Sequence, residues 1–463
     1  MNSTLKKIYT ILPKPIQNSV SEIWYRVPPH IKYGQAYSDM FDLLKKSETW
    51  SKDQLATWQI EKIKQLSIHA YETTSYYNKS FNDAGFNPYN LKDLNDLSRI
   101  PVIDKITVQK NIGGLLSNKY SRQHRQKMST GGTTGNQMKF YIQRGFTLPR
   151  ERAFFHYLWE KAGFDYKKDK LVVLRNNILP HNQLWEYNHI EHKWLIDPFH
   201  LTDENCEKII YFLNEIKIPF FHVYPSSAII LSNYINSTGH RLTYTPKAIF
   251  ASSENLYSGQ REVIEKAFNA KLLLHYGHSE MCCVAPWCLD ENHYHINEIY
   301  GYTELLDDND NTIYSPNKIG EIACTGFNNY VFPLIRYKTA DYAAYASHRG
   351  KCTFEGRLFE SIEGRWRQEM LLTSKGNKIS MTSINFHSDI FDNIKNYQFF
   401  QDKAGFVTLR IVRKESYTQK DEYGIKSAML EKLGDDTVLD IQYVKDIEKT
   451  ANGKFRYVIS KIE

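Results

Sequence analysis

The residues between 129 and 135 combine backbone freedom with hydroxyl groups, and they are the stretch of this chain best suited to binding an anion. Three glycines among them let the backbone adopt positive φ angles and turn successive N–H groups inward, which forms a concave nest for phosphate oxygens. Four Ser and Thr hydroxyls can add donors around the same anion. The predicted phosphate loop consists of Ser129, Thr130, Gly131, Gly132, Thr133, Thr134 and Gly135.

The spacing within this loop differs from two better-known phosphate-binding patterns. A Walker loop requires GxxxxGK[ST] and a dinucleotide-binding loop requires GxGxxG, and neither occurs around Asn136. The alternative is a polar hairpin turn, because short Gly/Thr runs are common in turns. Polarity alternates on both sides of the loop, which predicts that it joins two strands, at 124–128 and 138–143.

Composition limits the class of protein. A chain of 463 residues is too long for one core, so at least two domains are expected. A net charge of +7 suits an anionic ligand but is too small over this length to indicate a nucleic acid partner. The most apolar long segment, 209–235, is interrupted by charged residues and prolines, so no transmembrane segment is predicted. The irregular spacing of six cysteines and the short N-terminal apolar run favour a reduced, cytoplasmic protein.

The elements that must position the loop follow from hydrophobic periodicity. Helical and strand patterns alternate from residue 147 to residue 277, which predicts a largely parallel sheet covered by helices. Ligands of such sheets bind beyond the carboxyl ends of the strands. The expected helices cover 147–162, 205–217, 225–234 and 258–268, and the expected strands cover 171–176, 218–225, 247–252 and 271–277.

The regions outside this alternation have other patterns. An amphipathic helix capped by Ser51 is predicted over 51–73, whereas residues 1–50 show no clean period. Short strands separated by turns from 294 to 342 predict an antiparallel barrel or sheet.

The last hundred residues predict a separate α+β unit, with strands at 407–413 and 439–445 and a helix that ends at Gly434. The expected fold class is therefore α/β. We expect a large N-terminal domain (1–363) of helix-covered mixed sheets plus a small antiparallel barrel-like part, followed by a small, mobile α+β C-terminal domain (364–463).

Six stretches, in order, resemble the motifs of the adenylate-forming superfamily, which contains acyl-CoA synthetases and peptide adenylation domains. The branch that the chain resembles is that of the phenylacetate–CoA ligases, including the CapK-type proteins associated with capsule polysaccharide biosynthesis. The resemblance runs from about residue 95 to the C-terminus. The stretches are STGGTTGNQMKF (129–140), FASSENL (250–256), YGHSE (276–280), PLIRYKTAD (333–341), IEGRW (362–366) and ANGKFRYVIS (451–460).

This resemblance implies a nucleotide site for ATP and Mg²⁺. The phosphate loop would hold the β- and γ-phosphates, although Asn136 stands where the family often has lysine. Tyr276 would stack on adenine and Asp341 would accept the ribose hydroxyls, with Ala340 in place of the usual glycine. The other implied contacts are the adenine pocket at Ser253 and Glu254, the α-phosphate contact at Ser279, Mg²⁺ at Glu280, and the neighbouring Gly277 and His278.

Two further residues would act with the C-terminal domain. Lys454 would reach into the site and stabilise charge on the α-phosphate. Arg365 would contact ribose or phosphate at the start of the hinge, and we prefer it to the earlier Gly356–Arg357 pair because the C-terminal unit follows it. By position in the family, the acyl pocket falls at Tyr224, Ser226, Ser253, Gly277 and His278.

A zinc site is a further implication of the same branch. Cys288, His295 and Cys352 fall near the places of zinc-type ligands, and Glu355 stands where a second cysteine of a pair would be. These residue types can bind Zn²⁺. The alternative is that the cysteines are ordinary buried residues. Cys282 and Cys283 are expected to belong to the core or to line a pocket.

The predicted function is ATP-dependent activation of a small-molecule carboxylic acid to an acyl-adenylate, followed by transfer to a nucleophile. The acceptor is left open between the thiol of CoA, the thiol of a carrier protein and the amine of an amino sugar. Besides a CoA ligase and an amide-forming ligase, a third hypothesis is a nucleotide-binding scaffold without turnover. The sequence identifies neither the acid nor the oligomeric state. It is compatible with a homodimer.

Overall fold

We describe the fold from a computed structural model of the chain. It describes residues 9, 11–130, 138–175, 179, 183–254, 256, 259–288, 293–347, 355–363, 370–380, 384, 389–391, 393–434, 436–447 and 458–462.

A seven-stranded sheet carries the carboxyl edge at which ligands were expected. Its strand order is β4-β5-β3-β6-β7-β8-β9, in which β5, β3, β6, β7 and β8 are parallel and the outer strands are antiparallel to their neighbours. The predicted, largely parallel sheet is therefore confirmed. The strands are β3 (Leu171–Leu174), β4 (Trp185–Asn188), β5 (Lys193–Ile196), β6 (Phe220–Val223), β7 (Ala248–Ser252), β8 (Leu272–Gly277) and β9 (Val284–Pro286).

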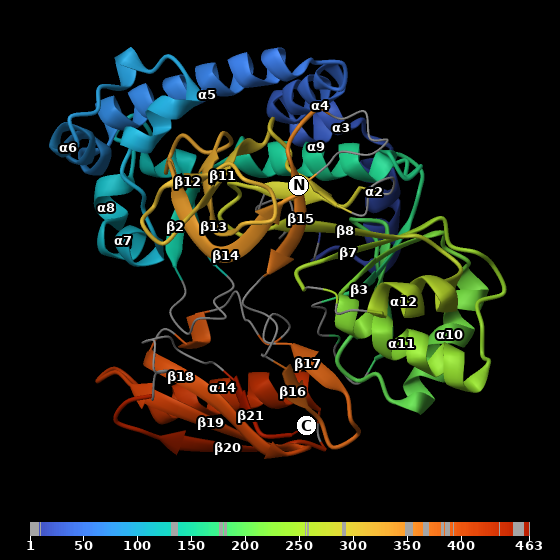
Figure 1. The fold of residues 1–463 in the computed structure, drawn as a ribbon. Coiled ribbons are helices and arrows are strands. Elements are labelled where there is room, and N and C mark those ends of the chain that lie inside the picture. The colour runs from blue at the N-terminus through green and yellow to red at the C-terminus, as the bar shows by residue number, and fades with distance from the viewer. Residues whose placement is uncertain are drawn as a thin grey trace.

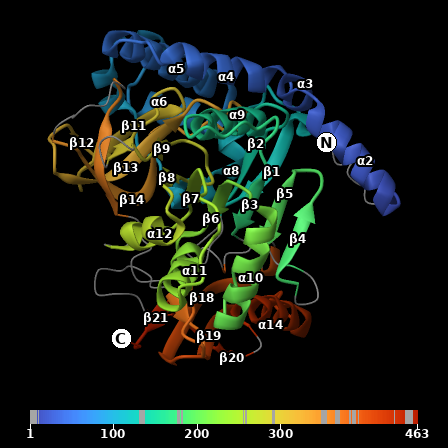
Figure 2. The same cartoon turned by 90° about the vertical axis from the view of Figure 1, so that its right-hand side faces the viewer.

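Helices cover both faces of this sheet because its strands are apolar on both sides. On one face Trp159 of α9 stacks on Phe250 of β7, with ring centroids 4.8 Å apart. On the other face α10, α11 and α12 share one apolar core with the strands, and Figures 1 and 2 show these helices side by side. The helices are α9 (Thr147–Glu160), α10 (Asp203–Ile216), α11 (Pro225–Thr238) and α12 (Gln260–Phe268).

A six-stranded antiparallel sheet lies beside the first sheet, as the strands between 294 and 342 predicted. Its order is β10-β15-β14-β13-β11-β12. The two sheets meet closely at Gly301, where a Cβ atom would lie 2.1 Å from the carbonyl oxygen of Cys282, so only glycine fits there. The strands are β10 (Tyr294–His295), β11 (Gly301–Leu306), β12 (Thr312–Ile313), β13 (Ile319–Gly326), β14 (Tyr337–Tyr345) and β15 (Leu358–Glu363).

Helices of the N-terminal region pack over these sheets (Figure 1). The helix predicted at 51–73 is α5, and Ser51 closes a capping box with Gln54. No element was predicted before residue 51, and the described residues between 14 and 47 form further helices. The helices before β1 are α2 (Lys14–Arg26), α3 (Pro29–Tyr33), α4 (Gln35–Ser47), α5 (Lys52–Thr73), α6 (Ser75–Asp83), α7 (Lys105–Lys110) and α8 (Ile112–Leu115), with short 3-10 turns at Pro88–Asn90, Leu94–Arg99 and Arg122–His124.

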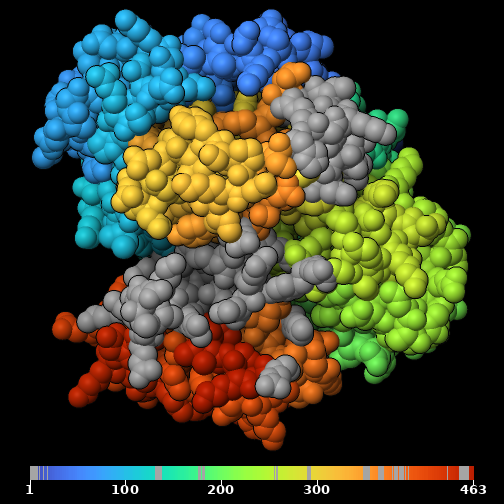
Figure 3. All heavy atoms as spheres, in the orientation of Figure 1, coloured from blue at the N-terminus to red at the C-terminus, as the bar shows by residue number. Residues whose placement is uncertain are grey.

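Residues from 370 onward build their own core around a four-stranded sheet of order β20-β19-β18-β21, which α14 covers. Figures 1 and 3 show this unit below the rest of the chain. It touches the larger part where the Lys432 ammonium lies 5.5 Å from the ring centroid of Phe199. The elements are β16 (Met370–Leu372), β17 (Lys378–Ser380), a 3-10 turn (Asp389–Phe391), β18 (Ile394–Lys403), β19 (Phe406–Arg413), α14 (Gln419–Leu433), β20 (Val438–Tyr443) and β21 (Val458–Ser460).

Candidate active site

The phosphate loop is carried by a hairpin of two short strands, β1 (Arg125–Ser129) and β2 (Lys139–Gln143). At the base of the loop, the Thr130 N–H donates to the Met138 carbonyl oxygen over 2.9 Å, and the Met138 N–H donates to the Thr130 hydroxyl over 3.0 Å. Buried Met138 and Phe140 anchor the second strand in the core. The prediction that the loop joins two strands is confirmed, whereas residues 131–137 lie outside the described residues.

Glu280 lies directly beyond β8, where two donors hold its carboxylate. His278 Nδ1 is 3.1 Å from Oε2, and the Tyr337 hydroxyl donates to Oε1 over 2.8 Å. The side chains of His278 and Glu280 are each only 11% exposed. A buried carboxylate with a buried imidazole beside it forms an ion pair that is screened only weakly by water.

This ion pair determines the protonation of both residues. Burial would lower the pKa of His278, but the hydrogen bond and the charge of Glu280 raise that pKa to about 9. Burial would raise the pKa of Glu280, but the hydrogen bond and charge of His278, helped by Tyr337, lower it to about 2. At neutral pH, His278 is therefore a cation and Glu280 an anion.

These pKa shifts predict how stability changes with pH. Because the pKa of His278 is raised, its stabilising charge is fully present below its ordinary pKa of about 6.5 and is lost as pH rises to about 9. The loss is on the order of 3 kcal/mol. Because the pKa of Glu280 is lowered, its contribution is lost only as pH falls from about 4.5 toward about 2. We expect the Tm to fall between pH 6.5 and 9, and to fall less in His278→Gln.

Thermal unfolding from pH 6 to pH 10 measures this effect. The exposed His30→Gln is the matched control and should follow the wild-type curve. A His278→Gln curve parallel to that of the wild type would contradict the proposed charge state.

Asp341 is hydrogen bonded to Tyr276, the first residue of the stretch 276–280 at the end of β8. The Tyr276 hydroxyl donates to Asp341 Oδ2 over 2.9 Å, and the Asp341 N–H donates to the Thr339 hydroxyl. Tyr337, four residues earlier on the same strand as Asp341, donates back to Glu280. The stretches 276–280 and 337–341, predicted from separate motifs, are therefore hydrogen bonded to each other in both directions.

Ala340 adopts a backbone conformation that explains the glycine usual at this position of the superfamily. Its φ angle is 60°, in the left-handed region that β-carbon sterics disfavour. Its N–H donates to Glu321 Oε1 over 3.1 Å, and Glu321 pairs with Lys338. The substitution of alanine for glycine keeps the backbone shape at the cost of local strain.

Cysteines surround the histidine of this site. Cys324 Sγ lies 3.5 Å from His278 Nε2, and the Cys282 thiol donates to the Glu280 carbonyl oxygen over 3.4 Å. Both thiols are free and buried, as is Cys283, and all three belong to one apolar core. The expectation that Cys282 and Cys283 are core residues is confirmed.

Glu254 caps a helix beside the predicted acyl pocket. Its Oε2 accepts the Ser226 N–H over 2.8 Å, in the first turn of α11. A carboxylate is stabilised at a helix N-terminus by the free amides and by the helix dipole. Tyr224 is the N-cap residue of the same helix and is buried. The structure thus brings Tyr224, Ser226, Ser253 and Glu254 together at the ends of β6 and β7.

Sequence reasoning missed Arg175 at this edge. It follows β3 directly, and its guanidinium bonds to His222, Ser252 and Ser253. Its position after an apolar strand in an alternating α/β pattern is the signal that could have identified it. Sequence reasoning also missed Tyr337 as a partner of Glu280.

Several predicted site residues lie outside the described residues. These are the loop residues Gly131, Gly132, Thr133, Thr134 and Gly135, together with Arg365, Lys454 and Cys352. Gly277 ends β8, and His278, Ser279 and Glu280 follow it, as the motif requires.

The structure gives the zinc prediction no support. The described part of the chain holds no group of three or more His, Cys, Asp or Glu residues that could bind a metal ion. Cys288 is buried, and its N–H donates to the carbonyl oxygen of His293, whose ring pairs with Glu360 over 2.8 Å.

The carboxylate of Glu280 is a ligand of the type that Mg²⁺ prefers. Mg²⁺ in nucleotide sites is bound by one or two carboxylates together with the substrate phosphates. Glu280 offers a hard oxygen ligand that keeps its charge.

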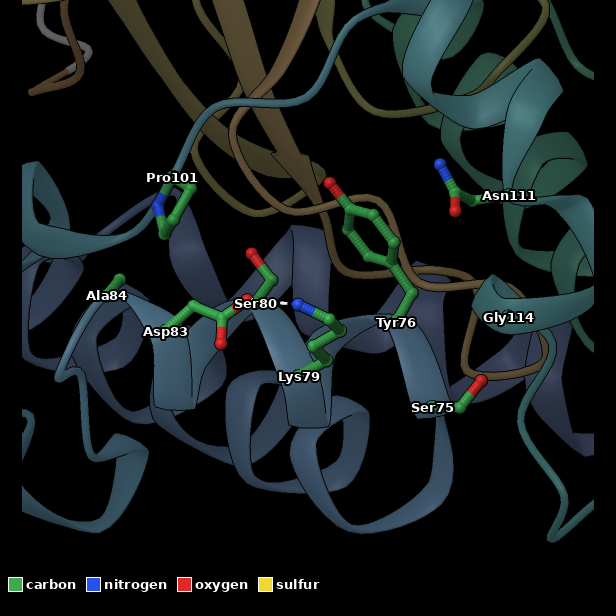
Figure 4. A pocket seen from close by; sticks show the side chains of 9 residues that line it. All are labelled: Ser75, Tyr76, Lys79, Ser80, Asp83, Ala84, Pro101, Asn111 and Gly114. Atoms are coloured by element: carbon green, nitrogen blue, oxygen red, sulfur yellow. Dashed lines mark hydrogen bonds and ion pairs between the residues drawn. The ribbon is translucent and has the colours of Figure 1, made fainter.

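A polar hollow of about 660 Å³ lies away from these motifs, between α6 and the segment that carries α7 and α8. Figure 4 shows Lys79, Ser80 and Asp83 on one side and Asn111 and Gly114 on another. Lys79 and Asp83, four residues apart in α6, form an ion pair on the surface. None of the predicted site residues lines it.

Among the described helices, none is long and apolar enough to cross a membrane.

Comparison with known proteins agrees with this arrangement. The family described as CapK C-terminal domain matches residues 371–461. Protein CapK of Staphylococcus aureus is 27% identical over 385 residues, which are 80% of this chain and 81% of that protein. Phenylacetate–coenzyme A ligase of Escherichia coli is 24% identical over 380 residues, which are 80% of this chain and 85% of that protein.

A solved structure shares the fold. The crystal structure of 2-hydroxyisobutyryl-CoA ligase in complex with 2-HIB-AMP and CoA superposes with a TM-score of 0.57 at 17% identity, covering 90% of this chain and 91% of that one. The helix-covered mixed sheets followed by a small C-terminal unit are thus the architecture of such ligases. The chain is thus similar over most of its length to CapK and to phenylacetate–CoA ligases, and it shares the fold of an adenylate-forming CoA ligase.

Proposed function

We propose that this chain activates a carboxylic acid with ATP and then transfers the acyl group to a nucleophile. In the first half-reaction an oxygen of the acid attacks the α-phosphorus of ATP, the bond to the bridging oxygen breaks, and pyrophosphate leaves. In the second, the nucleophile attacks the acyl carbon, its proton is lost, and AMP leaves. The products of the first step are an acyl-adenylate and pyrophosphate.

One observation carries this proposal: the reciprocal bonds of Tyr276 with Asp341 and of Tyr337 with Glu280. They tie Asp341 of β14 to the end of β8, and Glu280 beyond β8 to β14, and each carboxylate has a distinct use in binding a nucleotide. Asp341 can accept both ribose hydroxyls with its two oxygens. Glu280 can hold Mg²⁺, which when bound supplies positive charge at the phosphates.

The remaining roles rest on the sequence motifs. We assign the phosphate loop (129–135) to the β- and γ-phosphates, and Ser279 to the α-phosphate. Lys454 stabilises the negative charge that develops on the α-phosphate during adenylation. We place the domain boundary between 363 and 364, with rotation about Arg365 separating the two half-reactions.

CoA is the first candidate acceptor, because the relatives include phenylacetate–coenzyme A ligases. A second candidate is the amine of an amino sugar or its precursor, in surface polysaccharide biosynthesis in the cytoplasm. We keep this second candidate because residues 371–461 match the CapK C-terminal domain and CapK-type proteins are associated with capsule polysaccharide biosynthesis.

Acid-dependent ATP–pyrophosphate exchange tests the activation step. The panel contains aryl, hydroxy, fatty and amino acids, and Lys454→Ala is assayed beside the wild type. We expect exchange with at least one acid, reduced about a hundredfold in Lys454→Ala because its cation is absent from the transition state. The exposed Lys445→Ala, in the same C-terminal unit, is the matched control and should retain full exchange.

Release of AMP then identifies the acceptor. AMP release that needs CoA supports a CoA ligase, and AMP release that needs an amino sugar supports amide formation. ATP binding without exchange for any acid would favour a nucleotide-binding scaffold and would contradict the proposed activity.

A further inference from the structure

Arg175 lies at the carboxyl edge of the sheet, and its side chain reaches Ser253 at the end of β7, next to the strand that leads to Glu280. It directly follows β3, and its side chain extends across β6 toward β7. Nη1 is 2.5 Å from His222 Nε2 and donates to the Ser252 hydroxyl over 2.6 Å, and Nη2 donates to the Ser253 hydroxyl over 3.0 Å. Ser252 pairs in register with His275, the residue before Tyr276.

The partners of this guanidinium carry no charge. His222 accepts from Arg175, so its imidazole is neutral, and burial together with Arg175 holds its pKa well below the ordinary value. Burial and Arg175 likewise lower the pKa of His275 to about 3. Arg175 is therefore the charged member of a cluster of neutral groups.

A partly buried cation without an acidic partner is unusual in a protein interior. Within the described part of the chain, no carboxylate lies within ion-pair distance of Arg175. The nearest acidic residue in sequence to its serine partners, Glu254, uses Oε2 to cap α11.

The described groups around the guanidinium are all uncharged. Arg175 bonds to His222, Ser252 and Ser253 and also hydrogen bonds with Tyr224, whose ring it lies against. A guanidinium has five N–H donors in a planar fork that matches a carboxylate bidentately, and none of these partners supplies one.

Two further features place this donor at the acyl pocket. The Tyr224 ring, predicted to line that pocket, lies 5.1 Å from the Arg175 guanidinium carbon. Ser253, also predicted to line it, has a φ angle of 73°, a strained conformation for a residue other than glycine. Such strain is concentrated at binding sites.

We propose that Arg175 binds a second carboxylate on the substrate acid, so that the chain activates short dicarboxylic acids. This inference rests on the proposed function, because Arg175 would bind the end of the same substrate that does not react. The reacting carboxylate lies at the residues after β8, and Arg175 lies over the end of β7. One to two strand spacings separate the two ends, about 5 to 10 Å.

Matched pairs of acids test this selectivity by ATP–pyrophosphate exchange. The pairs are 3-carboxyphenylacetate with phenylacetate and adipate with hexanoate, and the readout is the ratio of rates within a pair. This ratio is independent of the amount of folded enzyme. We expect a ratio of at least a hundred in the wild type, about one in Arg175→Met, and an intermediate ratio in Arg175→Lys. Arg99→Met is the control, because the Arg99 side chain is 66% exposed.

Two results would overturn the inference. One is a wild type that prefers the monoacids, and the other is an Arg175→Met variant that slows both acids of a pair by the same factor. The second result would mean that Arg175 holds the reacting carboxylate, a phosphate or the fold.

Calorimetric binding of the same acids separates this inference from the proposed function. Diacid binding to the wild type but not to Arg175→Met, without exchange for any acid, would support the diacid site and contradict the ligase activity. Exchange with monoacids in the wild type and in Arg175→Met, with no preference of the wild type for the diacid of any pair, would support the ligase activity and overturn the diacid site. Neither binding nor exchange with any diacid would also overturn it.

Discussion

Glu280→Gln should lower the rate of acyl-adenylate formation about a hundred- to a thousandfold. The amide can still accept the hydrogen bond from Tyr337, so the local shape is kept, but the negative charge is lost. A neutral oxygen binds Mg²⁺ weakly, and His278 loses the charge that raises its pKa. The measurement is single-turnover formation of acyl-AMP at increasing Mg²⁺ concentration.

The matched control is Glu360→Gln. Glu360 also pairs with a histidine, His293, but its side chain is 45% exposed and lies outside the proposed site. It should keep the wild-type rate. If high Mg²⁺ has no effect on Glu280→Gln and its rate equals that of the control, Glu280 is not the metal ligand.

Arg336→Met should destabilise the protein by about 3 to 5 kcal/mol. The Arg336 and Glu304 side chains are 3% and 1% exposed, and they form a bidentate pair with distances of 2.7 and 3.1 Å. Arg336 also donates to the Ile100 carbonyl oxygen over 2.7 Å. Removing the cation leaves a buried carboxylate and a carbonyl oxygen without this partner.

Urea unfolding measures this loss. Glu304→Leu combined with Arg336→Met should recover part of it, because an apolar pair leaves no buried charge. Lys79→Met is the control for an ion pair on the surface, where the Lys79 and Asp83 side chains are 78% and 63% exposed. Its effect should be much smaller than that of Arg336→Met, because exposed ion pairs contribute little to stability. Equal losses for Lys79→Met and Arg336→Met would contradict the role of burial.

The alternating core of the fold could be predicted because its signals are local. Strands such as LVVL at 171–174 are short apolar runs, and α5 begins with a capping box. The helices before residue 50 were missed because Pro13, Pro28 and Gly34 interrupt the sequence, so that no single period runs through this region.

The hairpin of β4 and β5 was missed for a different reason. Its turn lacks the Asn-Gly or Gly-rich pattern that marks hairpins, and His192 takes the left-handed position with a φ angle of 49°. A residue that rarely adopts this conformation gives no sequence signal for the turn.

The site could be predicted only in part. Motif order located Tyr276, Glu280 and Asp341, but their hydrogen-bond partners are 57 and 65 residues away along the chain. Such pairings depend on how β8 and β14 are placed in space, and no local pattern records that. Arg175 was missed because its partners come from β6 and β7. Its charge indicates a binding role only when these partners are known to be neutral.

The tyrosine bonds between the two sheets also have a mechanical consequence. Tyr276 reaches from β8 to the strand that carries Asp341, and Tyr337 reaches from that strand back to Glu280. Two hydrogen bonds between the same two segments hold the end of β8 and β14 together more firmly than one would. The hinge proposed at Arg365 lies beyond this junction, on the C-terminal side of β14. A nucleotide held by both carboxylates would keep one orientation during both half-reactions.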